Sequence, residues 1–261
     1  MAQHRSESDT PRARSAVYAL LARAFAYPEP AHVTAIREIG TALATAVNGL
    51  YAEAVALAAA APEPEVLAAA YTRLFTHSTS RDCPTFETAY TAQDAFQQAQ
   101  QMADIVGFYR AFGVLHAPGG ERPDHISAEL EFMHFLALKE AYACEMLGAP
   151  RVRQCRRAQA LFLRDHLACW APAFGRRVAL LDPGGWYGRA GRLLAEWMDR
   201  ECHAFQVQPT LAVAGPRLPW PEPDDGTCGI ADPTGDPCAG CAPSAPPDGR
   251  REALPLSLLD Q

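Results

Sequence analysis

The chain has 261 residues, of which 49% are hydrophobic and 20% charged, and its formal net charge is −7. These values are typical of a soluble globular protein with one large core. The negative charge, without any basic stripe, argues against nucleic-acid binding. No stretch reaches the roughly 18 apolar residues of a membrane helix, and no leader-like cleavage site follows the first apolar run. We therefore expect a cytoplasmic protein without membrane insertion.

Helical periodicity runs along most of the chain. Residues 1–10 are expected to be flexible, with Thr10 as N-cap and Pro11 as the first helical residue. Helices are predicted over about 11–27, 31–61 (with a candidate break at 48–49), 65–75, 93–112, 124–147, 151–172 and 186–207. The helix at 93–112 has a predicted buried stripe of Phe96, Ala99, Met102, Ile105, Val106 and Tyr109.

The remaining segments read as loops or tail. Residues 77–90 and 113–123 carry turn-forming residues in quick succession. From Pro209 onward, proline and glycine become frequent and the apolar periodicity is lost. We predict an all-α fold, with a single helical-bundle domain over 11–208 and an irregular Pro/Gly/Cys-containing tail over 209–261.

The most distinctive segment is a loop that enters a helix at residues 121–133. Pro123 stiffens the entry, and Asp124 is the expected N-cap, where the helix dipole also favours its charge. His125 and Glu129 are four residues apart and share one helix face. Glu131 and His134 form a single E-x-x-H pair, whereas a di-iron bundle needs two. Nucleophile-elbow, Walker and dinucleotide motifs are absent, so we do not expect an enzyme.

This segment, with Glu121, Pro123, Asp124, His125 and Glu129 at its characteristic positions, closely resembles the signature of the TorD/DmsD family. The run from Cys83 through Phe86 and Glu87 to Tyr90 is similar to an earlier loop of the same family. The resemblance covers about residues 11–208. It implies an all-helical chaperone for a molybdoenzyme of the dimethyl-sulfoxide-reductase type. Such a chaperone binds the twin-arginine signal peptide and apoprotein of the catalytic subunit, assists cofactor insertion and proofreads before export.

A receptor for a twin-arginine peptide needs carboxylates, which pair with arginine in bidentate fashion, and an apolar groove. The candidate carboxylates are Glu87, Glu121, Asp124 and Glu129, and the candidate groove walls are Phe86, Tyr90, Tyr109 and Phe132. Each carboxylate has a simpler interpretation as a surface charge, and each aromatic residue as ordinary core. His125 has a structural interpretation too, or it makes the site sensitive to pH. The loop at 113–123 is compatible with a monomer or a domain-swapped dimer.

Eight cysteines are present, and in a cytoplasmic protein they do not indicate a disulfide framework. Three of them, Cys228, Cys238 and Cys241, cluster in the tail. The Cys-Ala-Gly-Cys turn suits two thiolates on one ion, and zinc or an iron–sulfur cluster usually needs four ligands. Cys83 is the preferred fourth, with Cys202 and His203 as alternatives. A metal-binding redox protein is therefore the alternative function. Free thiols and a redox-active disulfide remain open, and the chaperone function itself needs no cofactor.

Overall fold

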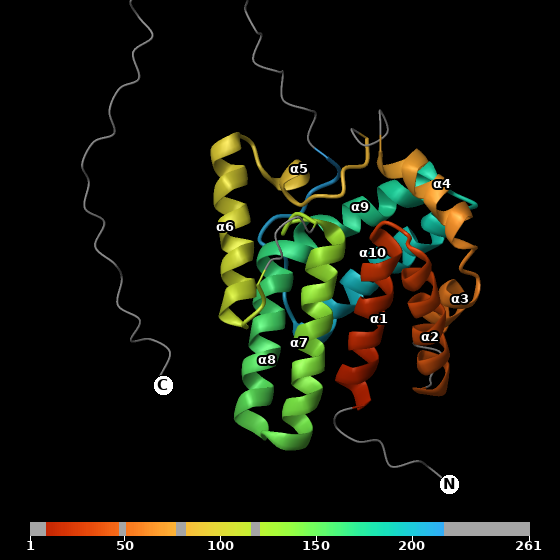
Figure 1. Ribbon diagram of the computed structural model, residues 1–261. Helices are drawn as coiled ribbons and strands as arrows, with labels where there is room; N and C mark the ends of the chain where they lie inside the picture. The colour runs from red at the N-terminus through yellow and green to blue at the C-terminus, as the bar shows by residue number, and fades with distance from the viewer. Residues whose placement is uncertain (1–8, 47–50, 77–81, 116–120, 217–261) are drawn as a thin grey trace, which may run out of the picture. The chain divides into compact units, whose positions relative to one another are not determined.

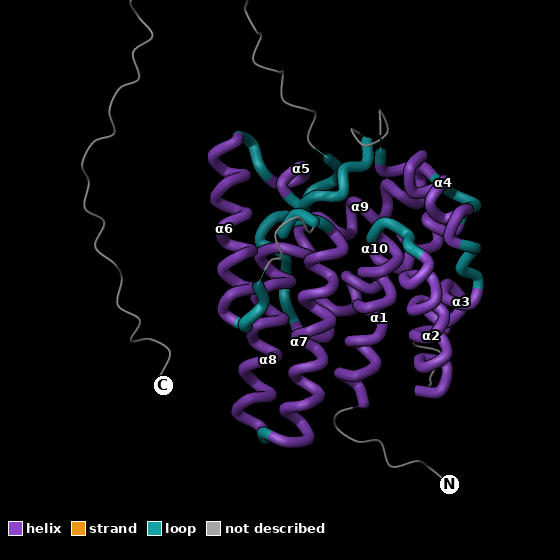
Figure 2. The backbone as a smooth tube through the Cα atoms, in the orientation of Figure 1, coloured by secondary structure: helices purple, strands orange, loops and turns teal. Residues whose placement is uncertain are grey.

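A computed structural model describes residues 9–46, 51–76, 82–115 and 121–216, all within one unit of the chain, residues 1–219. These residues form helices joined by loops, and no strand occurs among them (Figure 2). The predicted all-α fold is confirmed. None of the described helices combines the length and hydropathy that a membrane span requires.

The first half of the bundle consists of α1 (Asp9–Phe25), α2 (Pro30–Ala46), α3 (Ala52–Ala59) and α4 (Pro64–Phe75). Helix α1 packs mainly against α2 and α7 (Figure 1). Within the second predicted helical stretch, α2 ends at Ala46 and α3 begins at Ala52. The candidate break at 48–49 lies outside the described residues and stays a prediction. The predicted start of α1 was wrong by two residues, since the helix begins at Asp9 and Thr10 already lies within it.

The middle of the chain forms α5 (Thr88–Thr91), α6 (Ala95–Ala111), α7 (Ile126–Met146) and α8 (Ala149–Phe162). Helices α7 and α8 are joined through Leu147 and Gly148. Gly148 has φ 80°, a left-handed conformation that glycine adopts without a steric penalty. This tight turn lets α7 and α8 pack along each other (Figure 1).

Helix α6 stands at the edge of the bundle, beside α8 (Figure 1). The predicted buried stripe was right only in part. Ile105 and Tyr109 are buried and Met102 and Val106 are half-buried, but Phe96 is 76% exposed and Ala99 is exposed as well. Since α6 packs along a narrow face only, periodicity alone overestimated its burial. The outer part of α6 is therefore available as the wall of a surface pocket.

A π-helical turn, Leu163–Leu167, leads from α8 into α9 (Ala168–Leu181). The helix predicted over 151–172 was expected to end near Pro172, and this was wrong because α9 continues past that residue. A proline inside a helix costs about 3 kcal/mol. Trp170, Phe174 and Val178 are fully buried on α9, and such burial contributes about 1.5–3 kcal/mol for each side chain. Packing therefore carries the helix past its proline.

Helix α10 (Trp186–Phe205) packs closely on α9. The two helices cross at Gly175 and Gly191, where a Cβ atom on either residue would collide with the carbonyl oxygen of the other. Glycine at both positions lets the two backbones approach. This crossing orients α9, and with it the π-helical turn at the start of α9.

A buried ionic network ties α1, α7, α8 and α10 together. The Arg14 guanidinium donates to Glu201 at 2.6–3.0 Å, to Glu140 at 3.0 Å and to Gln159 at 2.7 Å. Tyr18 donates to Glu201 at 2.9 Å. Burial opposes the charge on Arg14, but the hydrogen bond and the charge of Glu201 outweigh it and leave the Arg14 pKa raised. Sequence patterns gave no sign of this network.

Candidate functional site

The two sequence motifs lie side by side. Phe86 and His125 form an isolated antiparallel bridge. The Glu87 amide donates to the Asp124 carbonyl at 2.9 Å, and the Ile126 amide donates to the Thr85 carbonyl at 2.9 Å. Although 36 positions separate Thr88 from Asp124, their side chains are hydrogen bonded. One short backbone pairing therefore joins the loop before α5 to the start of α7.

Asp124 is completely buried and its carboxylate is used within the protein. Arg122 donates to it through Nε and Nη2, each at 2.9 Å, and the Thr88 hydroxyl donates at 2.7 Å. The Arg122 guanidinium stacks on the Phe86 ring at 4.4 Å. Asp124 therefore holds the two motifs together, and the expectation that it caps the helix was wrong.

His125 is the N-cap of α7. Its backbone is extended, with φ −73° and ψ 140°, because it pairs with Phe86, so the helix starts one residue later. The ring Nδ1 accepts from the Ser127 amide at 3.2 Å and lies 2.6 Å from the Ser127 hydroxyl. Burial lowers the pKa of His125, while the nearby charges of Glu121 and Asp124 oppose that shift. A neutral ring, which can accept at Nδ1, suits the cap.

Glu129 and Glu87 form a buried carboxyl pair, with exposed fractions of 0% and 2%. Trp170 Nε1 donates to Glu129 Oε2 at 3.3 Å, and His166 Nδ1 lies 3.3 Å from Glu87 Oε1. Burial raises the pKa of Glu129 well above its ordinary value, and the charge and hydrogen bond of Glu87 raise it further. Burial and the neighbouring Glu87 thus both favour the protonated form of Glu129.

The other predicted site residues occupy different environments. Tyr90 is fully buried against Trp170, with ring centroids 5.1 Å apart, and its hydroxyl interacts with Cys83. Pro123 is buried, and its carbonyl accepts from the Tyr109 hydroxyl at 2.7 Å. Glu121 is exposed at the start of the segment.

The two further candidate groove walls, Tyr109 and Phe132, are core residues whose rings lie 4.7 Å apart. They pack α6 onto α7, and neither is among the residues that line the pocket described below. Their burial agrees with the simpler interpretation of these two residues as ordinary core.

The predicted metal ligands stay a prediction. Cys228, Cys238 and Cys241 lie outside the described residues. Cys83 is completely buried, and burial raises its pKa to about 12. Within residues 9–216, as far as they are described, no three His, Cys, Asp or Glu side chains are placed to hold a metal ion.

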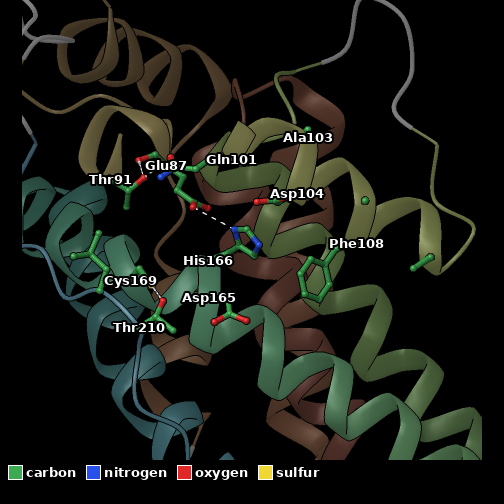
Figure 3. Close-up of a pocket in the computed structure, with 13 residues that line it drawn as sticks. Glu87, Thr91, Gln101, Ala103, Asp104, Phe108, Asp165, His166, Cys169 and Thr210 are labelled. Carbon is green, nitrogen blue, oxygen red and sulfur yellow. Dashed lines mark hydrogen bonds and ion pairs between the residues drawn. The ribbon is translucent and has the colours of Figure 1, made fainter. Parts of the chain in front are cut away.

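A surface pocket of about 640 Å³ adjoins the paired motifs. Helix α6, the π-helical turn and the segment after α10 form its walls (Figure 3). Its lining consists of Glu87, Thr91, Gln101, Ala103, Asp104, Gly107, Phe108, Ala111, Asp165, His166, Cys169, Thr210 and Leu211. Of the predicted site residues that the structure describes, Glu87 alone lines this pocket.

The pocket lining is acidic. It includes Glu87, Asp104 and Asp165, and no lysine or arginine is among the described residues that line it. Asp165 is paired with its neighbour Arg164 at 2.7–2.8 Å on the surface. His166 reaches Glu87 from the π-helical turn (Figure 3). Asp104, Asp165 and His166 were missed from the sequence, and no motif marks them.

The α6 wall carries a stripe of small residues. Ala103, Gly107 and Ala111 are spaced by four and are all exposed, and Phe108 lies beside them. A Cβ atom at Gly107 would meet nothing within 4 Å. Small residues at this spacing leave an open strip along the helix.

The segment after α10 forms the opposite wall. The Thr210 amide donates to the Arg164 carbonyl at 2.8 Å, and the Val213 amide donates to the Cys169 carbonyl at 3.3 Å. The Cys169 thiol lies 3.7 Å from the Thr210 hydroxyl (Figure 3). The first residues of the predicted tail are thus non-helical but hydrogen bonded to the π-helical turn and α9.

Comparison with known proteins identifies relatives. Residues 36–176 match the family described as nitrate reductase delta subunit. The chain is 47% identical over 70 residues to the perchlorate reductase assembly chaperone protein of Dechloromonas aromatica, covering 26% of this chain and 30% of that protein. It is 29% identical over 142 residues to the chaperone protein TorD of Vibrio cholerae, covering 53% and 62%.

A longer match is found with the chlorate reductase assembly chaperone protein of Ideonella dechloratans. It is 26% identical over 204 residues, which are 77% of this chain and 94% of that protein. The matches to the perchlorate reductase chaperone and to TorD span less than two thirds of those proteins.

Proposed function

Since the chain belongs to the nitrate reductase delta subunit family, with TorD-type chaperones among its relatives, we propose that it is a non-catalytic chaperone for the maturation of a molybdenum-containing reductase. Its relatives are named for the assembly of perchlorate, selenate and chlorate reductases. The chaperone acts in the cytoplasm on the unfinished catalytic subunit. It binds that subunit's twin-arginine signal peptide, assists cofactor insertion and holds the client back until it is complete.

One observation carries the signal-peptide part of this proposal: the pocket beside the family motifs has three acidic side chains and no lysine or arginine among the described residues that line it. A carboxylate inside a partly enclosed pocket attracts a guanidinium more strongly than one in bulk water. Glu87 and Asp104 supply that attraction. Phe108 and the small-residue stripe of α6 supply the apolar contact for the segment that follows the arginines.

The motif residues behind the pocket have supporting roles in this proposal. Asp124 and Arg122 join the motifs, His125 starts α7, and Glu129 sits directly behind Glu87. Tyr90 packs on Trp170, which in turn donates to Glu129. In this proposal most residues of the family signature support the pocket from behind, and Glu87 is the signature residue that contacts the client.

The decisive experiment fills the pocket without disturbing the fold. In Gly107→Leu, the new side chain enters open space on an exposed helix face. We expect the affinity for a fluorescently labelled twin-arginine peptide to fall at least about ten-fold, which corresponds to about 1.4 kcal/mol. The matched control is Gly184→Leu, at an exposed glycine between α9 and α10 that also has open space around it. It should bind like the wild type.

A second titration tests the chemistry of the ligand. Replacing both arginines of the peptide by glutamine should reduce affinity by about 1.5–3 kcal/mol for each charged hydrogen bond lost. Anisotropy titrations of the two peptides give this difference. The signal peptide does not use this pocket if Gly107→Leu binds the peptide as tightly as the wild type does and the glutamine peptide binds as tightly as the twin-arginine peptide.

A further inference from the structure

We propose that Glu87 and Glu129 hold a single proton between them while the pocket is empty, and that a guanidinium group bound at Glu87 drives this proton into solvent. The inference rests on the proposed function for its ligand, but the shared proton itself is a property of the free protein. It assigns Glu129, which does not line the pocket, the role of a positioning residue that sets the charge of Glu87.

The geometry of the pair supports a shared proton. Glu87 and Glu129 are both almost completely buried. His166 Nδ1 is the hydrogen-bond partner of Glu87 Oε1, and Trp170 Nε1 donates to Glu129 Oε2. The remaining oxygens, Glu87 Oε2 and Glu129 Oε1, are buried and receive no hydrogen bond from a donor elsewhere in the described residues. A proton between the two carboxyl groups is the donor that these oxygens lack.

No lysine or arginine in the described part of the chain is bonded to this pair, and His166 is the titratable group that contacts Glu87. From α6, the pair faces the buried Tyr109 hydroxyl, whose pKa is raised by burial and by Glu129. From the π-helical turn it faces His166, next to Asp165, and from α9 it faces Trp170 and Cys169. On the motif side Asp124 adds negative charge, and the nearby Arg122 is already bonded to Asp124. Two ionised carboxylates there would repel each other in a medium that screens poorly.

A second pair of buried carboxyl groups in the same bundle has a cationic side chain as its shared partner. Glu140 and Glu201 are also buried, and both accept from the single guanidinium of Arg14. In the Glu87–Glu129 pair this guanidinium is missing, and the pair adjoins an open pocket. An arginine of the ligand at Glu87 would take the part that Arg14 takes in the core.

The charge balance of binding follows. The guanidinium brings one positive charge to Glu87, and the Glu129 carboxyl releases one proton to water, so the O–H bond of Glu129 breaks and no other bond changes. Burial and Glu87 both favour the protonated form of Glu129 in the free protein. Below the pKa of the pair, binding should therefore tighten as pH rises, by up to about ten-fold per pH unit for one released proton.

The first arm of the test needs no ligand. Infrared spectra of the free protein at neutral pH should show the carbonyl band of a protonated carboxyl group, and Glu129→Gln should remove it. In this variant the amide still donates to Glu87 and still accepts from Trp170, so the pocket keeps its shape. A free protein without a protonated carboxyl band overturns the inference, whether or not the peptide binds.

The second arm measures the proton. Calorimetric titrations of a twin-arginine peptide in two buffers of different ionisation enthalpy should show release of up to one proton per peptide for the wild type. Glu129→Gln should bind without release, and its affinity should lose its pH dependence. Glu87→Gln should lose binding at every pH.

The outcomes are distinguishable. Binding without proton release in the wild type, or equal release by Glu129→Gln, overturns the inference and leaves the proposed function standing. If the carboxyl band is present but the wild type does not bind the peptide, the proposed function fails. The proposed proton release on peptide binding then fails as well.

Discussion

Two groups of buried carboxyl side chains lie in the same bundle and differ in one respect. Glu140 and Glu201 surround Arg14, which donates to both, and Arg156 adds a second hydrogen bond to Glu140 at 3.0 Å. Among the described residues, the side chains of Glu87 and Glu129 have only His166 and Trp170 as hydrogen-bond partners from outside the pair. The first group lies between α1, α7, α8 and α10, whereas the second adjoins the pocket.

From this difference we infer a structural role for the first group and propose a binding role for the second. Buried carboxylates that have a full set of partners hold helices together, and little is left for a ligand to contribute. Buried carboxyl groups without a counter-ion are costly to ionise. Where such groups lie next to a pocket, a cationic ligand can supply the missing positive charge. Burial alone would not have distinguished the two groups.

The largest expected effect comes from removing the counter-ion of the first group. Arg14→Met leaves Glu140 and Glu201 buried without their shared partner, which should reduce the free energy of unfolding by about 3–5 kcal/mol. Urea denaturation measures this loss. The matched control is Arg12→Met on the same helix, where the exposed ion pair with Glu145 should contribute less than about 1 kcal/mol. Similar losses in both variants would contradict the structural role of the Arg14 group.

The second prediction concerns Glu129 in the second group, where a substitution should make the protein more stable relative to wild type as pH rises. The raised pKa of Glu129 means that its contribution to stability is present in full below the unfolded-state pKa, near about 4.3. It is lost as pH rises toward the folded-state value. Glu129→Gln does not titrate, so its stability relative to wild type should increase with pH, by up to about 1.4 kcal/mol per unit over that range. Urea denaturation at several pH values gives the difference. A flat difference would contradict a protonated Glu129.

The smallest effect concerns the cap beside the second group. His125→Ala should cost about 1 kcal/mol through loss of the acceptor for the Ser127 amide, whereas His125→Asn, which can still cap, should cost less. The lowered pKa of His125 means that its contribution is present above about pH 6.5, the ordinary histidine value, and is lost as pH falls through the folded-state pKa. Thermal unfolding from neutral to acidic pH tests both points. Equal melting temperatures for Ala and Asn variants would show that the cap is not what His125 contributes.

Much of the fold was predictable because helices depend on local spacing. The seven predicted helical stretches correspond to described helices. The errors have tertiary causes. Helix α9 passes Pro172 because Trp170 and Phe174 are buried on it, and Phe96 is exposed because α6 packs along a narrow face.

The site was predictable only in part. The family motifs drew attention to Glu87, which lines the pocket, and to Asp124, His125 and Glu129, which lie behind it. Asp104, Asp165 and His166 carry no motif, because their role depends on the meeting of α6 with the π-helical turn. Such residues become recognisable only when distant segments are placed together.

The sequence by itself determined the all-helical architecture, the main helix boundaries and the family signature, since each depends on residues close together along the chain. Only the tertiary structure decided which charged residues are paired. Arg14 reaches Glu201 across 187 positions, and Glu87 reaches His166 across 79. Whether a buried carboxylate lies next to an arginine or next to a second carboxylate depends on how the helices pack. The spacing of hydrophobic residues directs that packing, but it does not indicate which charged residues will meet.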